Sequence, residues 1–137
     1  MQIKWNDQFL TGHEDIDSHH QELFFLTQAI DQALISHKRS DVEKIITYLE
    51  DYVVDHFKEE ENIMLHYKFN GYEAHRHEHY LFREQMIVIR KQFEQNPSLT
   101  HSIFLIRQFI DAMMIHILKV DQKIATLVKT YHHEQSS

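Results

Sequence analysis

The sequence predicts an all-α protein, an antiparallel up-down-up-down four-helix bundle preceded by an irregular N-terminal arm. Only two glycines and one proline occur in 137 residues, so long stretches contain no helix breaker. Along four of these stretches, apolar residues recur three and four positions apart, as they do on a helix with one buried face. The connections between the stretches are short, which favours antiparallel neighbours. A chain of this length forms one ordinary domain, which we expect to comprise residues 1–137.

The first two predicted helices follow the arm, which covers residues 1–17. Ser18 with Gln21 matches a capping box and begins a helix expected at about residues 18–36. Ser40 with Glu43 repeats this pattern before a helix expected at about 41–66. The apolar stripes of these helices comprise Leu23, Phe24, Ile30 and Leu34, and Ile45, Leu49 and Val53.

The other two predicted helices follow polar breaks in the chain. Asn70 with Glu73 precedes a helix expected at about residues 71–95. Asn96-Pro97-Ser98 interrupts the chain before a helix expected at about 98–131. Their stripes comprise Phe82, Met86, Ile89 and Phe93, and Ile106, Phe109, Met113, Val120, Ile124 and Leu127. Because the bundle core uses all four stripes, we expect a monomer.

Composition and charge limit the partners of the chain. The formal net charge is −7 with histidines neutral, whereas nucleic acid and anionic membrane both attract basic surfaces. No stretch is long and apolar enough to cross a bilayer, and the N-terminus has no apolar signal segment. The absence of cysteine excludes disulfides and thiolate metal sites. We therefore expect a cytoplasmic protein with neither nucleic acid nor membrane as a partner.

The chain contains thirteen histidines, a large excess, and some of them stand in core positions. His56 and Glu60 are four residues apart, as are His75 and His79, so each pair shares a helix face at about 6 Å along the axis. His116 also falls in the stripe of its helix. The remaining predicted site residues are His20, just ahead of the first stripe, and Asp121.

His116 and Asp121 are five residues apart, which leaves about 140° between them on a regular helix. If both reach one site, the helix must loosen locally, so we predict a π-bulge near residues 116–121. His77 points about 200° away from the face of its neighbours and is expected in solvent. We assign no site role to the other histidines, which comprise His13, His19, His37, His66, His101, His132 and His133.

These residue types together indicate a metal centre. A single core histidine is usually a hydrogen-bonded structural residue, but burying an unpaired glutamate costs many kcal/mol. Imidazole binds iron, zinc, copper and nickel, and seven protein ligands are too many for one tetrahedral zinc. Two carboxylates among five imidazoles fit two metal ions bridged by Glu60 and Asp121. Counting ligands leaves di-iron, di-manganese and di-zinc centres open.

The chain resembles the hemerythrins, in particular the single-domain bacterial ones. Four segments carry the resemblance: Ile16-Asp-Ser-His-His20-Gln-Glu-Leu23, His56-Phe-Lys-Glu-Glu60-Glu61, His75-Arg-His-Glu-His79-Tyr-Leu-Phe82 and His116-Ile-Leu-Lys-Val-Asp121. The resemblance implies two iron ions (Fe2+/Fe3+) with an oxo or hydroxo bridge. It assigns His75, His79 and His116 to one iron and His20 and His56 to the other, with Glu60 and Asp121 bridging them. It also implies that O2 binds reversibly at the open position of the two-histidine iron, for carriage, storage or delivery in the cell.

Two alternatives use the same centre: an O2 or redox sensor, and a diiron redox enzyme that handles peroxide or nitric oxide. We prefer an O2-binding protein to an enzyme because no separate acid–base residue is placed for turnover. The sequence also departs from the family at Ala112, where many bacterial members carry a tryptophan. The smaller side chain either opens a path to the site or leaves space that Met113 and Met114 fill.

Overall fold

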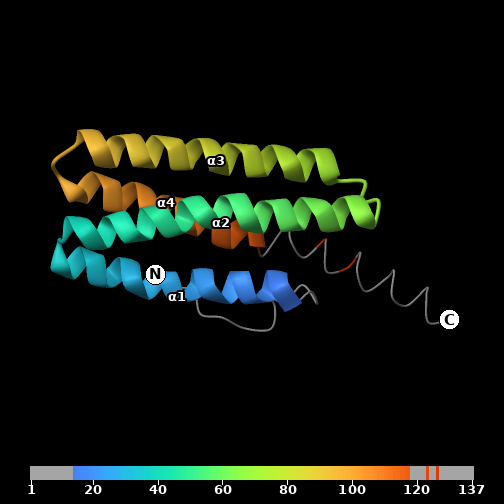
Figure 1. Ribbon diagram of the computed structural model, residues 1–137, viewed down its shortest axis with the longest axis horizontal. Coiled ribbons are helices and arrows are strands. Elements are labelled where there is room, and N and C mark those ends of the chain that lie inside the picture. Colours follow the sequence, from blue (N-terminus) through green and yellow to red (C-terminus); the bar gives the residue numbers. More distant parts are fainter. Residues whose placement is uncertain (1–13, 118–122, 124–125, 127–137) are drawn as a thin grey trace.

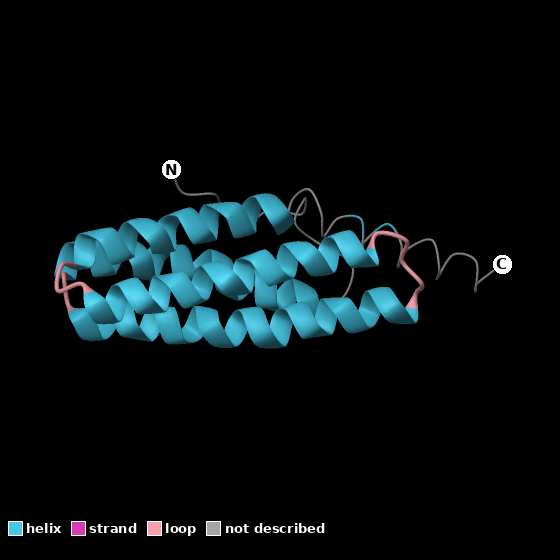
Figure 2. Ribbon diagram, turned by 90° about the horizontal axis from the view of Figure 1, so that it is seen from above, coloured by secondary structure: helices cyan, strands magenta, loops and turns pink. Residues whose placement is uncertain are grey.

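The computed structural model describes residues 14–117, 123 and 126, and within them it contains helices and no strand. The helices are α1 (Glu14–Ser36), α2 (Arg39–His66), α3 (Tyr72–Gln95) and α4 (Leu99–His116). They lie side by side, and short connections reverse the direction of the chain after each of the first three (Figure 1). Both α1 and α3 pack against α2 and α4, and the view from above shows the same elongated bundle (Figure 2). The predicted all-α four-helix bundle is confirmed.

The first helix begins earlier than predicted. α1 starts at Glu14, so Ser18 lies inside the helix and does not cap it, and the last residues of the predicted arm 1–17 are helical. A physical reason lies in the first turn, where Glu14 and Asp17 bring negative charge to the positive end of the helix dipole. The arm at residues 1–13 lies outside the described part of the chain.

The predicted side-chain caps of α2 and α3 are also wrong. The residue that precedes α2 is Lys38 and not Ser40, and the residue that precedes α3 is Gly71 and not Asn70. Lys38 and Gly71 make no side-chain cap hydrogen bond. Ser98 does precede α4, but its side chain makes no cap hydrogen bond either. A cap contributes about 1 kcal/mol, whereas a buried stripe contributes about 1.5–3 kcal/mol for each large side chain. Burial of the stripes therefore determines where these helices form.

The described members of the predicted stripes face the bundle interior, whereas the side chains of Leu34, Val120, Ile124 and Leu127 lie outside the described part. The buried members are Leu23, Phe24, Ile30, Ile45, Leu49, Val53, Met86, Ile89, Phe93, Ile106, Phe109 and Met113. Phe82 packs against this core and is partly buried. Because the helices are antiparallel, the beginning of α1 and of α3 lies at the same end of the bundle as the end of α2 and of α4. The predicted site residues other than Asp121, which lies outside the described residues, come from these four helix segments, so the topology brings them to one end.

The end of α4 lies close to the predicted π-bulge. α4 ends at His116, and the next residue, Ile117, is π-helical although its N–H still bonds to the carbonyl of Met113. The rest of the predicted bulge, including Asp121, lies outside the described residues, so the bulge stays a prediction. Of the predicted helix beyond Ile117, the structure describes only Lys123 and Thr126, and both are helical. No helix in the described part of the chain is long and apolar enough to cross a membrane.

Candidate metal centre

Six of the seven predicted site residues meet at one buried point of the bundle. Each has at most 4% of its surface exposed, and the six are His20, His56, Glu60, His75, His79 and His116. Asp121 lies outside the described residues. All four helices contribute, and Glu60 on α2 stands between the histidines of the other three.

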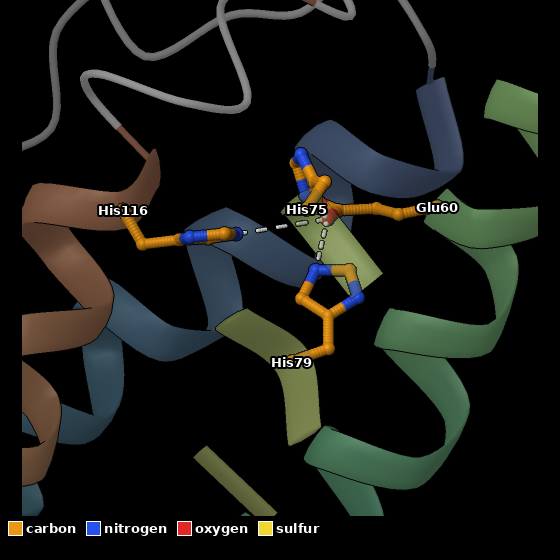
Figure 3. A group of neighbouring side chains, drawn as sticks. All are labelled: Glu60, His75, His79 and His116. Atoms are coloured by element: carbon orange, nitrogen blue, oxygen red, sulfur yellow. Dashed lines mark hydrogen bonds and ion pairs between the residues drawn. The ribbon is translucent and has the colours of Figure 1, made fainter. Parts of the chain in front are cut away.

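One oxygen of Glu60 faces three histidines. Oε1 lies 3.0 Å from Nε2 of His75, 3.1 Å from Nε2 of His79 and 3.9 Å from Nε2 of His116. Figure 3 shows the three rings turned toward the carboxylate, two from α3 and one from α4. The four-residue spacing of His75 and His79 aligns them on one helix face, as predicted.

The other oxygen of Glu60 faces two histidines. Oε2 lies 2.9 Å from Nε2 of His56 and 3.5 Å from Nε2 of His20. The two Nε2 atoms of this pair are 3.0 Å apart. The five histidines therefore form one group of three and one group of two, and the Glu60 carboxylate separates the groups.

The charge states of this cluster suit metal ligands. Burial raises the pKa of Glu60, but the neighbouring His56 and hydrogen bonds from His116 and His20 outweigh it and hold this pKa well below its ordinary value. Burial lowers the pKa of His79, against the opposing effect of Glu60. At neutral pH the carboxylate is therefore anionic and the His79 imidazole neutral, which are the forms that bind metal ions.

Two carboxylates behind the three-histidine group were not assigned a role from the sequence. Glu61 Oε2 lies 3.6 Å from Nδ1 of His79, and Glu78 Oε2 lies 3.2 Å from Nδ1 of His116. Carboxylates at the outer nitrogen orient metal-binding imidazoles and raise their basicity. Each stands directly beside a predicted ligand, Glu61 after Glu60 and Glu78 before His79. This adjacency is the only sign in the sequence that Glu61 and Glu78 lie near the site. Helical periodicity argues against it, because neighbouring residues on a helix point about 100° apart.

Aromatic rings pack on the histidines, and they were not assigned to the site from the sequence. Phe57 is parallel to His79, with ring centres 3.9 Å apart, and Tyr52 stacks on His56 at 4.8 Å. Phe57 and Tyr52 have 0% and 6% of their surface exposed. These rings restrict the imidazole orientations and keep the surroundings of the centre apolar.

The donor set fits metal ions. All five imidazoles direct Nε2 at the carboxylate, and two of them present Nδ1 to an outer carboxylate, as metal-bound histidines do. A cation among these atoms would offset the cost of burying Glu60 and would satisfy several ring nitrogens at once. The other histidines that the structure describes well, His37, His66, His77 and His101, are exposed and stand apart from the cluster, as predicted.

The fold and this cluster define a class, a four-helix bundle with a buried histidine- and carboxylate-lined cation site. The family model "Hemerythrin HHE cation binding domain" matches residues 11–128. The chain belongs to this family, whose members hold non-haem iron.

Similar proteins agree with the family match. A bacteriohemerythrin of Stenotrophomonas maltophilia is 25% identical over 130 residues, covering 94% of this chain and 83% of the relative. A bacteriohemerythrin of Pseudomonas paraeruginosa is 27% identical over 92 residues, covering 67% of this chain and 60% of the relative. A hemerythrin-like protein of Naegleria gruberi is 28% identical over 88 residues, covering 64% of this chain and 69% of the relative.

Proposed function

We propose that the chain binds two iron ions at this centre and that the loaded protein binds O2 reversibly, for carriage, storage or delivery. The observation that carries the proposal is the division around Glu60. One carboxylate oxygen faces three imidazole nitrogens and the other faces two, so a single buried side chain could bridge two ions. Family membership supports iron as the metal.

Each group of residues has a distinct role in this proposal. His75, His79 and His116 hold one ion, and His20 and His56 hold the other. Glu60 bridges the two, and Asp121 is the second proposed bridge. The pair of histidines provides one ligand fewer than the group of three, so the open coordination position for O2 belongs to the ion held by His20 and His56.

The surrounding side chains would keep the bound state reversible. Iron bound by these residues would supply the electrons that O2 takes up and returns in reversible binding. Buried apolar residues such as Leu23, Phe57 and Met64 exclude water from this end of the bundle. Exclusion of water disfavours loss of charged products and therefore irreversible oxidation.

Anaerobic reduction followed by exposure to O2 and its removal tests the proposal. We expect about two iron ions per chain by metal analysis, and a visible charge-transfer band that appears with O2 and disappears when O2 is removed. Irreversible conversion to the oxidised form, with consumption of peroxide, would instead support a redox enzyme. Iron well below two per chain after loading would contradict the proposed centre.

A further inference from the structure

A run of stacked rings leads from the candidate centre to the surface along α2. Tyr48, Tyr52 and His56 are spaced by four residues and so share one helix face. The rings of Tyr52 and His56 are 4.8 Å apart and 21° from parallel, and those of Tyr48 and Tyr52 are 6.3 Å apart and 27° from parallel. His56 ends the run inside the cluster, with Nε2 at 2.9 Å from Glu60.

The outer end of this run has a proton acceptor and access to solvent. The Tyr48 hydroxyl donates a hydrogen bond of 2.9 Å to Oε2 of Glu22, an exposed residue on α1. A surface cavity of about 250 Å³ lies over this end, and its lining residues are Glu22, Tyr48, Asp51, Tyr52, Asp55 and His56. Burial, together with Glu22, raises the pKa of Tyr48, so the phenol is protonated at neutral pH.

This arrangement matches the requirements for oxidation of a tyrosine. A phenol gives up an electron readily only when its proton leaves at the same time, and a hydrogen-bonded carboxylate accepts that proton. Packing alone would require the rings of Tyr48 and Tyr52 but not their hydroxyl groups. The bond from Tyr48 to Glu22 is therefore the feature that separates a redox role from a packing role.

We propose that Tyr48 and Tyr52 are redox-active and carry oxidising equivalents from the metal centre to the surface when hydrogen peroxide reacts there. The inference rests on the proposed iron centre. One H2O2 takes up two electrons and two protons, its O–O bond breaks and two waters form. Tyr48 and Tyr52 each lose one electron and the phenolic proton and become neutral phenoxyl radicals. The peroxide takes up the phenolic proton of Tyr52 and one proton from solvent, and the proton of Tyr48 passes to Glu22 and then to solvent.

The surface cavity gives the outer tyrosine a route back to its reduced form. A small electron donor of the hydroquinone class, entering beside Tyr48, returns one electron and one proton to each phenoxyl radical. Two such transfers oxidise one hydroquinone to a quinone. Tyr52 is only 6% exposed, so it is reduced through Tyr48 and not by direct contact with the donor.

Electron paramagnetic resonance of the iron-loaded protein tests this inference. The iron is first oxidised to the ferric form, so that it does not itself supply the two electrons, and the sample is frozen after addition of one equivalent of H2O2. We expect a tyrosyl radical signal in the unmodified protein and its loss in Tyr52→Phe, which keeps the ring but removes the hydroxyl. In Tyr48→Phe the signal remains, on Tyr52, but decays more slowly when hydroquinone is added. Tyr80→Phe is the matched control, because Tyr80 lies exposed on α3 and stacks on His77.

A further variant and two parallel measurements distinguish failure of the tyrosine route from failure of the proposed iron centre. Glu22 is exposed and is not one of the proposed ligands, and we expect Glu22→Gln to slow formation of the radical. A signal unchanged in Tyr52→Phe, or lost in Tyr80→Phe, would overturn the inference. Iron content and reversible O2 binding are measured on the same samples. If both are normal and no tyrosyl signal forms, the tyrosine route alone is wrong, whereas absence of iron refutes the proposed function and this inference together.

Discussion

His77 stands between His75 and His79 in the sequence, but its side chain is exposed whereas theirs are buried against Glu60. This alternation makes His77 a matched control for the proposed ligands. We expect His79→Ala to weaken iron binding by more than the roughly 10–100-fold typical for loss of an outer partner of a ligand. His77→Ala should bind iron normally. The measurement is iron per chain after dialysis against a chelator, and equal iron in the two variants would exclude His79 as a ligand.

Ala112 is partly buried on α4, one turn before His116. Met113 and Met114 are 0% and 2% exposed and belong to the core. If the small side chain leaves a path to the centre, Ala112→Trp will slow autoxidation of the O2-bound protein. Ala29→Trp, on the exposed face of α1, serves as the control. The path idea fails if the autoxidation rates of Ala112→Trp and the unmodified protein agree.

At the scale of the elements, the apolar stripes predicted the helices well and the capping patterns predicted their starts poorly. The stripe residues lie in the core because burying a face of a helix stabilises every turn of that helix. A serine or asparagine at a helix start contributes through one hydrogen bond, but the residues that precede α2 and α3 are Lys38 and Gly71, not the predicted Ser40 and Asn70. In this chain, the spacing of apolar residues therefore predicts the positions of the helices better than local capping patterns do.

Arg39 connects the beginning of α2 with the end of α3. Its guanidinium donates to the carbonyl oxygens of Phe93 and Asn96 and lies over the Phe93 ring, 4.1 Å from the ring centre. A cation at the C-terminal end of a helix also interacts favourably with the helix dipole. We expect Arg39→Ala to lower the free energy of unfolding by about 1–2 kcal/mol. Lys91→Ala, exposed on α3, should change it by less than about 0.5 kcal/mol. Urea denaturation compares the two, and equal losses would show that Arg39 does not hold the helices together.

At the scale of the whole molecule, the candidate centre joins all four helices through side chains from each. A metal ion bound there stabilises the folded bundle and not the unfolded chain, by about 4 kcal/mol when its free concentration is 1,000 times its Kd. We therefore expect the Tm to fall by roughly 10 °C or more when iron is removed. Thermal unfolding before and after chelation, followed by circular dichroism, measures the difference. An unchanged Tm would mean that the ions do not connect the helices.

Acid should destabilise the metal-free protein through the buried cluster. The pKa of His79 is lowered in the folded state from its ordinary value of 6.5, so below that pH the unfolded chain binds this proton more readily and stability falls. The pKa of Glu60 lies well below its ordinary 4.5, so its contribution is complete above 4.5 and decreases at lower pH. Urea denaturation of the metal-free protein should give less stability at pH 5 than at pH 7.5, and His79→Leu should reduce this difference. A larger stability at pH 5 would contradict the direction of the His79 shift.

The sequence alone determined the four-helix class and identified the six described residues of the cluster, because both depend on spacing along a helix. Apolar stripes reveal the core faces, and the four-residue spacings of His56 with Glu60 and of His75 with His79 place each pair on one face. The relative height and rotation of separate helices depend on packing, which spacing along one helix does not determine. The tertiary structure therefore decided which oxygen of Glu60 faces which histidines, and which groups, such as Glu61 and Tyr52, stand behind them.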